Sequence, residues 1–150
     1  EEELNSQWQQ LKTIEKVNEG RVLDDTGHKF PALIRAQKLQ DAAAEYYFDW
    51  PEVEPVFAKI EEEIGELREA LLSSDKAHIL AEMGDVLFAC TNLARHVDVD
   101  AESALRQTNE KFIRRFDFVM KNMQKAGIEF SPEQLDQMEQ FWQQSKSVTG

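Results

Sequence analysis

The chain is organised around residues 59–85, which read KIEEEIGELREALLSSDKAHILAEMGD. This stretch contains two pairs of acids at a spacing of three residues, Glu63 with Glu66 and Glu82 with Asp85. Residues three apart lie on one face of a helix, so each pair directs two carboxylates to one place. If the two helices pack side by side, the pairs converge and repel each other unless a cation lies between them. Oxygen ligands of this kind favour Mg²⁺, Mn²⁺ or Ca²⁺.

The two pairs lie in different surroundings. At about 100° per residue, Glu63 and Glu66 share one flank of an apolar stripe with Lys59. The second pair lies in a helix that is apolar almost all round between Ile79 and Ala94, so we expect that helix to be buried on several sides. An acid without a partner there costs several kcal/mol, as an order of magnitude, which indicates a cation. Either pair alone also fits a solvated helix face in a chain with 29 acids.

The rest of the chain predicts an all-α fold. Apolar residues recur at spacings of three and four, and no segment alternates with period two. Helices are expected at residues 4–17, 31–48, 52–72, 77–96, 101–126 and 133–146. Asp49 and Glu52 are spaced like a capping box. Ser131, Pro132 and Gln134 give a second start signal, as cap, first-turn proline and capping-box partner, and Gly127 is a stop signal.

Composition excludes several classes of protein. The 150 residues are enough for one domain, and the net charge of −12 disfavours binding to nucleic acid or to an anionic membrane. No apolar run approaches the roughly 20 residues that span a bilayer, and the chain begins without a signal peptide, so we expect a cytoplasmic protein. Cys90 is the single cysteine, and its apolar neighbours predict a buried structural thiol. No P-loop, nucleophile elbow or GxGxxG motif occurs.

The acidic stretch resembles the EExxE–spacer–ExxD signature of the MazG family, a group of all-α nucleoside triphosphate pyrophosphohydrolases. The signature falls on Glu62, Glu63, Glu66, Glu82 and Asp85. Further similar segments follow the same order: PALIRAQKLQ at 31–40, FDWPEVEPVFAKIEEEIGEL at 48–67, GDVLFACTNLARH at 84–96 and NEKFIRRF at 109–116. The resemblance is closest to the C-terminal half of the tandem-domain members. We therefore expect residues 1–150 to form a single domain excised from a longer chain, which fits the absence of an initiator Met.

The resemblance implies a helical bundle with a four-helix core and additional terminal helices. It also implies Mg²⁺-dependent hydrolysis of nucleoside triphosphates, ATP among them, to the monophosphate and pyrophosphate, with Mn²⁺ as a substitute metal. The resemblance further implies a role in nucleotide-pool housecleaning and assembly as a homodimer or higher homo-oligomer. The implied metal ligands and catalytic acids are Glu63, Glu66, Glu82 and Asp85. The implied nucleotide contacts are Lys59, Lys111, Arg114, Arg115 and Trp142.

Alternatives to this function stay open at the level of sequence. A narrower dNTP or dUTP pyrophosphatase fits the same bundle, because the shape of the pocket cannot be derived from the pattern. A non-catalytic module that senses nucleotide or metal would keep the acids without turnover. Lys111, Arg114 and Arg115 also fit ordinary surface charge, and Trp142 also fits a core or interface residue.

Overall fold

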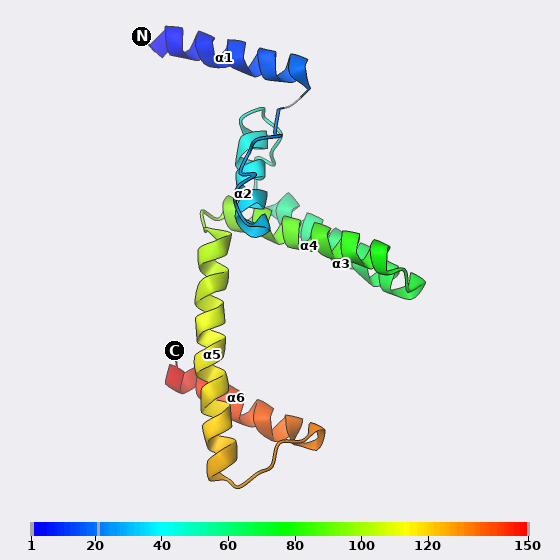
Figure 1. Cartoon of the computed structure of the whole chain (residues 1–150), viewed down its shortest axis with the longest axis vertical. Coiled ribbons are helices and arrows are strands. Elements are labelled where there is room, and N and C mark those ends of the chain that lie inside the picture. Colours follow the sequence, from blue (N-terminus) through cyan, green and yellow to red (C-terminus); the bar gives the residue numbers. More distant parts are fainter. Residues whose placement is uncertain (1, 21, 150) are drawn as a thin grey trace. The chain divides into compact units, whose positions relative to one another are not determined.

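The computed structural model describes residues 2–20 and 22–149, which are helical along most of their length (Figure 1). The described residues form α1 (Glu2–Glu19), α2 (Ala32–Ala44), α3 (Glu54–Ser73), α4 (Lys76–His96), α5 (Ala101–Lys125), the 3₁₀ turn η1 (Pro132–Gln134) and α6 (Leu135–Thr149). They contain no strand, so the all-α prediction is confirmed. None of the described helices is long and apolar enough to cross a membrane.

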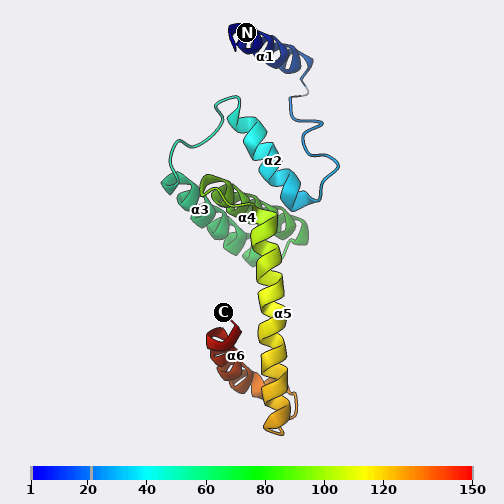
Figure 2. The same ribbon diagram turned by 90° about the vertical axis from the view of Figure 1, so that its left-hand side faces the viewer.

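The chain divides into two compact units between Ala101 and Glu102. In the first unit α3 and α4 pack side by side, and α2 packs against α4 (Figure 2). The second unit contains α5, η1 and α6, and the Phe112 ring of α5 lies 5.3 Å from the Trp142 ring of α6, between centroids. The acidic stretch 59–85 therefore lies wholly within the α3–α4 hairpin of the first unit.

A tight turn joins α3 to α4 and sets the two helices antiparallel. Ser74 ends α3 in the left-handed region, with φ of 56°. Asp75 is the N-cap of α4, and its Oδ1 accepts hydrogen bonds from the backbone N–H groups of Ala77 at 3.0 Å and His78 at 3.4 Å. An Asp N-cap satisfies backbone donors that would otherwise lack a partner at the start of a helix. The turn thus brings the acid-bearing faces of both helices together.

The end of α2 differs from the sequence prediction, which extended this helix to residue 48. The helix ends at Ala44, and Tyr47 adopts the left-handed region with φ of 63°. The backbone N–H of Phe48 donates to Ala43 O at 3.2 Å, and that of Tyr47 donates to Ala44 O at 2.9 Å. This is the hydrogen-bond pattern of a Schellman motif, which ends a helix and turns the chain.

The predicted capping box of Asp49 and Glu52 is wrong. Helix α3 begins at Glu54, and its N-cap, Val53, makes no side-chain capping bond. The Asp49 carboxylate instead accepts hydrogen bonds from Arg95, near the end of α4. A charged guanidinium offers stronger, forked hydrogen bonds than a backbone N–H, so the long-range partner takes the carboxylate.

The predicted burial of α4 on several sides is also wrong for the single chain. Ala89 and Thr91 are its buried residues, whereas Leu80 is 76% exposed. Cys90 is exposed as well, so the prediction of a buried thiol is corrected. The physical reason is that, within the first unit, α3 and α2 pack on only part of the circumference of α4.

The signals around α5 and α6 are partly confirmed. Gly127 has φ of 65° and follows the end of α5 at Lys125, as its stop signal predicted. Ser131 precedes η1 but makes no side-chain capping bond, so the predicted capping box with Gln134 is absent. The hydrogen bond there runs from the backbone N–H of Gln134 to Ser131 O, at 3.1 Å.

Candidate functional site

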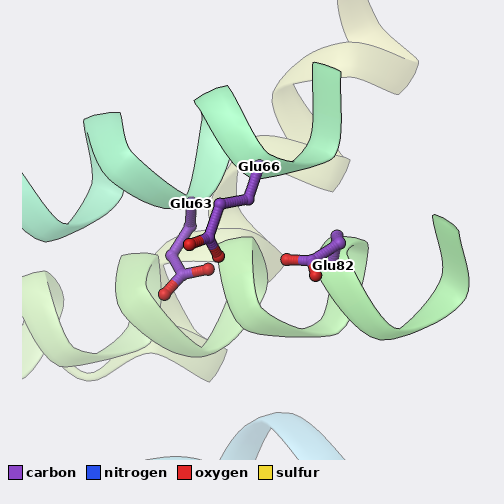
Figure 3. A group of neighbouring side chains, drawn as sticks. All are labelled: Glu63, Glu66 and Glu82. Atoms are coloured by element: carbon purple, nitrogen blue, oxygen red, sulfur yellow. The ribbon is translucent and has the colours of Figure 1, made fainter. Parts of the chain in front are cut away.

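Three acids from the two helices of the hairpin converge on one place. Glu63 and Glu66 point from α3 toward α4, and Glu82 faces them from α4 (Figure 3). One oxygen of each carboxylate lies within 4.8 Å of one oxygen of the others. The convergence expected from sequence thus occurs for three of the four predicted ligands. The fourth, Asp85, is exposed one turn further along α4 and is not part of this group.

Two oxygens of the cluster are buried without a partner. Glu63 is only 6% exposed, and its Oε2 makes no hydrogen bond. Glu82 is partly buried, and its Oε2 likewise makes none. A buried acceptor without a partner costs about 1–3 kcal/mol, and more when it is charged. Carboxylate oxygens in this arrangement fit a hard divalent cation, which would satisfy both of them.

Bases on the same helices hold the other oxygens of these two acids. Lys59 Nζ lies 2.8 Å from Glu63 Oε1 and 3.1 Å from Glu62 Oε2. His78 Nε2 lies 3.2 Å from Glu82 Oε1. The Lys59 ammonium, which the sequence assigned to nucleotide binding, is therefore engaged with carboxylates of its own helix.

The charges of the cluster act on one another. The hydrogen bond from Lys59 holds the pKa of Glu63 below its ordinary value, and Glu63 in turn raises the pKa of Lys59. The pKa of Glu66 is raised, first by hydrogen bonding with Glu63 and then by the negative charge of Glu63, with burial and Glu82 adding to the effect. Such mutual repulsion is what a bound cation relieves.

The predicted nucleotide contacts Lys111, Arg114, Arg115 and Trp142 all lie in the second unit. Arg115 and Trp142 meet: the guanidinium carbon lies 5.9 Å from the centroid of the Trp ring. Arg115 Nε also donates to Thr149 Oγ1 at 3.3 Å. Lys111 and Trp142 are partly buried, whereas Arg114 is exposed. The structure thus pairs Arg115 with Trp142, and nucleotide binding by any of the four stays a prediction.

An apolar pocket in the first unit was not predicted from the sequence. Its volume is about 470 Å³. Its walls come from α2, the loop after it, and α4, and include Leu39, Ala43, Phe48, Trp50 and Phe88. Gln40 lines it and is 7% exposed; its Nε2 donates to Phe88 O at 2.9 Å, which leaves Oε1 buried without a partner. A single polar residue in a helix gives no such signal in the sequence, because the pocket forms only when distant segments pack.

The pocket and the acidic cluster share one helix. Phe88 and Asn92 line the pocket, and they follow Asp85 on α4 by three and seven residues. At these spacings the three residues lie on the same face of the helix, one and two turns apart. One face of α4 therefore runs from Asp85 to the pocket.

A family model described as the MazG nucleotide pyrophosphohydrolase domain matches residues 51–120. Residues 51–120 form a MazG domain. This segment contains the whole acidic cluster of α3 and α4, so the family resemblance predicted from the sequence is confirmed.

Curated relatives match the MazG domain and its flanks. The nucleoside triphosphate pyrophosphohydrolase of Escherichia coli (strain K12) is 43% identical over 150 residues, which cover 96% of this chain and 56% of the relative. The nucleoside triphosphate pyrophosphohydrolase/pyrophosphatase MazG of Thermotoga maritima is 35% identical over 93% of this chain and 54% of its own length. The uncharacterized protein YabN of Bacillus subtilis (strain 168) is 36% identical over 99% of this chain and 31% of its own length. The chain thus spans about half the length of the first two relatives.

Proposed function

We propose that residues 1–150 act as one MazG-like domain, which hydrolyses nucleoside triphosphates to the monophosphate and pyrophosphate with Mg²⁺. The observation that carries this proposal is the pair of buried oxygens without partners, Glu63 Oε2 and Glu82 Oε2. Both residues belong, with Glu66, to the group in which one oxygen of each carboxylate lies within 4.8 Å of one oxygen of the others. The names of the two relatives of which this chain spans about half the length support the same activity.

The four acids of the signature have a common role in this proposal. Glu63, Glu66 and Glu82 would hold the cation, and Asp85, one helical turn beyond Glu82, would complete the ligand set. When bound, a divalent cation neutralises the triphosphate and lowers the pKa of an attacking water. Mn²⁺ is expected to replace Mg²⁺, because both prefer carboxylate and water ligands.

Basic side chains would position the polyphosphate. Lys111, Arg114 and Arg115 supply positive charge, and Arg115 offers a planar fork that suits phosphate oxygens. Lys59 would contact phosphate while it remains paired with Glu63. Trp142, whose ring packs on Arg115 and Phe112, would stack on the nucleotide. Hydrolysis of an anhydride requires this kind of positioning and charge stabilisation more than covalent catalysis.

The apolar pocket supports broad base specificity over the narrower dUTP activity. Its walls are largely apolar, and Gln40 Oε1 is its one buried acceptor without a partner among the described residues. Every common nucleobase has an N–H group that such an acceptor can bind, so one acceptor does not select uracil. The volume of about 470 Å³ lies in the range of small-molecule sites.

Exposed apolar side chains on the hairpin support a homodimer or higher homo-oligomer. Leu71, Leu80 and Leu87 are all exposed in the single chain. Large apolar side chains left exposed in the single chain are typical of a surface that a protein partner covers. A cytoplasmic nucleotide pool is the proposed setting, in keeping with a lone, unpaired cysteine.

A panel of nucleotides with separated products tests the proposal. ATP, the four dNTPs, dUTP and damaged nucleotides are incubated with the chain, with and without Mg²⁺, and the products are identified by chromatography. Monophosphate and pyrophosphate from many bases, only with Mg²⁺, are expected. Diphosphate and orthophosphate would reject the reaction, and turnover of dUTP alone would favour the narrower enzyme. Tight nucleotide binding without turnover would favour the sensing module.

A further inference from the structure

The two acids with buried, unpartnered oxygens are held in the same way. In each, a base four residues earlier on the same helix binds Oε1, and Oε2 is left free. Lys59 does this for Glu63 at 2.8 Å, and His78 does it for Glu82 at 3.2 Å. The free oxygens, Glu63 Oε2 and Glu82 Oε2, are both buried. Glu66, the exposed member of the cluster, has an acid, Glu62, in place of a base four residues earlier.

The backbone of His78 is itself fixed. His78 lies in the first turn of α4, where its N–H donates to the Asp75 cap at 3.4 Å. Residues four apart on a helix are neighbours, so the imidazole reaches Glu82 without strain. The side chain of His78 is 47% exposed and that of Glu82 is 16% exposed, so the contact runs from the surface into the cluster.

We propose that His78 is a positioning residue that orients Glu82 toward the divalent cation. The inference rests on the proposed function of the acidic cluster. The Nε2–H group of His78 holds Oε1 of Glu82 and so limits rotation of the Glu82 carboxylate about χ3. In this orientation Glu82 presents Oε2 to Glu63 and Glu66. Both the neutral ring with hydrogen on Nε2 and the charged ring donate this bond, so the role requires no change of protonation.

Replacing a residue that hydrogen-bonds a metal ligand typically lowers the affinity for the metal by 10–100-fold. Because His78 is half exposed, we expect the lower end of that range. His78 does not act as a ligand itself in this proposal, since its Nε2 is already bonded to Glu82. The cation is therefore expected to have an all-oxygen ligand set.

The test is a Mn²⁺ titration of the full 150-residue chain without nucleotide, with free Mn²⁺ followed by EPR. The Kd of His78→Ala is expected to rise about tenfold, whereas His78→Gln, whose side-chain N–H reaches Glu82, stays within about threefold of the wild type. His28→Ala is the matched control, because His28 is exposed and its Nδ1 lies 2.9 Å from the backbone oxygen of Asp25, away from any residue of the cluster. The metal-free unfolding midpoints of all variants, measured in EDTA, show whether each is folded.

Each outcome bears on the proposal. Wild-type affinity in a folded His78→Ala overturns the inference and leaves the metal site intact. Equal weakening in His78→Ala and His78→Gln also overturns it, because a hydrogen-bond donor would then not restore the role. A directly bonded nitrogen in the pulsed EPR spectrum of bound Mn²⁺ would make His78 a ligand instead. If the wild type binds no Mn²⁺, or Glu82→Gln binds it as the wild type does, the proposed function fails together with the inference.

Discussion

Asp49 and Arg95 tie the loop before α3 to the last turn of α4, with Arg95 Nη1 donating to Asp49 Oδ2 at 2.9 Å. The side chains of Arg95 and His96, which both contact this carboxylate, are only 13% and 10% exposed. Asn92 Oδ1 accepts from Arg95 Nε at 3.1 Å and fixes the guanidinium from the other side. Asp49 and Asn92 also line the apolar pocket, so this network holds one of its walls.

Replacing Asp49 with Ala is expected to destabilise the fold by about 2 kcal/mol. The reason is that Arg95 and His96 would stay largely buried but lose the carboxylate that they share, and Asn92 Oδ1 would still accept from Arg95. Urea unfolding followed by circular dichroism measures the loss. Asp24→Ala serves as the control, because Asp24 is exposed, and it is expected to change the free energy of unfolding by less than about 0.5 kcal/mol. Equal effects of the two variants would contradict a structural role for the network.

The stabilisation by Asp49 should depend on pH. The Arg95 hydrogen bond holds the pKa of the Asp49 carboxyl below its ordinary value of 3.8 in the folded chain. A lowered folded pKa means that the contribution is fully present above pH 3.8 and is lost as pH falls through the folded value. The difference in free energy of unfolding between wild type and Asp49→Asn is therefore expected to shrink as pH falls from about 5 to below 3.8. A difference that grows on acidification would contradict this account.

Glu66→Gln should separate catalysis from stability. Glu63 raises the pKa of Glu66, so the ionised Glu66 carboxylate is disfavoured in the metal-free fold. Removing its charge is expected to leave the metal-free unfolding midpoint unchanged or higher, and to lower turnover by at least about 100-fold. Calorimetry in EDTA and a pyrophosphate-release assay measure the two effects. Glu69→Gln, an exposed acid on the same helix, is the control; a stable Glu66→Gln with normal turnover would exclude Glu66 as a ligand.

Arg115→Lys should weaken substrate binding. Lysine keeps the charge but loses both the planar fork and the contact with the Trp142 ring. The KM for ATP is expected to rise about tenfold, which corresponds to about 1.4 kcal/mol. The control is Arg106→Lys, because Arg106 is exposed and pairs with Glu102 of its own helix at 3.5 Å. A KM unchanged by Arg115→Lys would favour the surface-charge interpretation of this residue.

The sequence predicted the features that depend on local spacing. The period of the apolar residues predicted the helices, because helix geometry is a property of neighbouring residues. Helix spacing, together with the short turn between the two helices, also predicted that Glu63, Glu66 and Glu82 converge. Gly127 ended α5 as predicted, since only the local backbone decides a left-handed stop.

The features that depend on distant segments were missed. Asp49 was assigned to a local cap, but its partner Arg95 lies 46 residues away. Cys90 was expected to be buried because its neighbours are apolar, yet it is exposed, since α3 and α2, the described helices of the first unit that pack on α4, leave that side of it open. Gln40 and Trp50 meet only where α2, the following loop and α4 pack, and nothing in their spacing indicates the pocket.

The anomalous scattering of Mn²⁺ in crystals of the chain tests the central claim most directly, because it locates the metal without reference to activity. One or more anomalous peaks are expected between α3 and α4, bound by Glu63 Oε2, Glu66 and Glu82 Oε2. Peaks only at other sites, or none at millimolar Mn²⁺ with the cluster accessible, would contradict it.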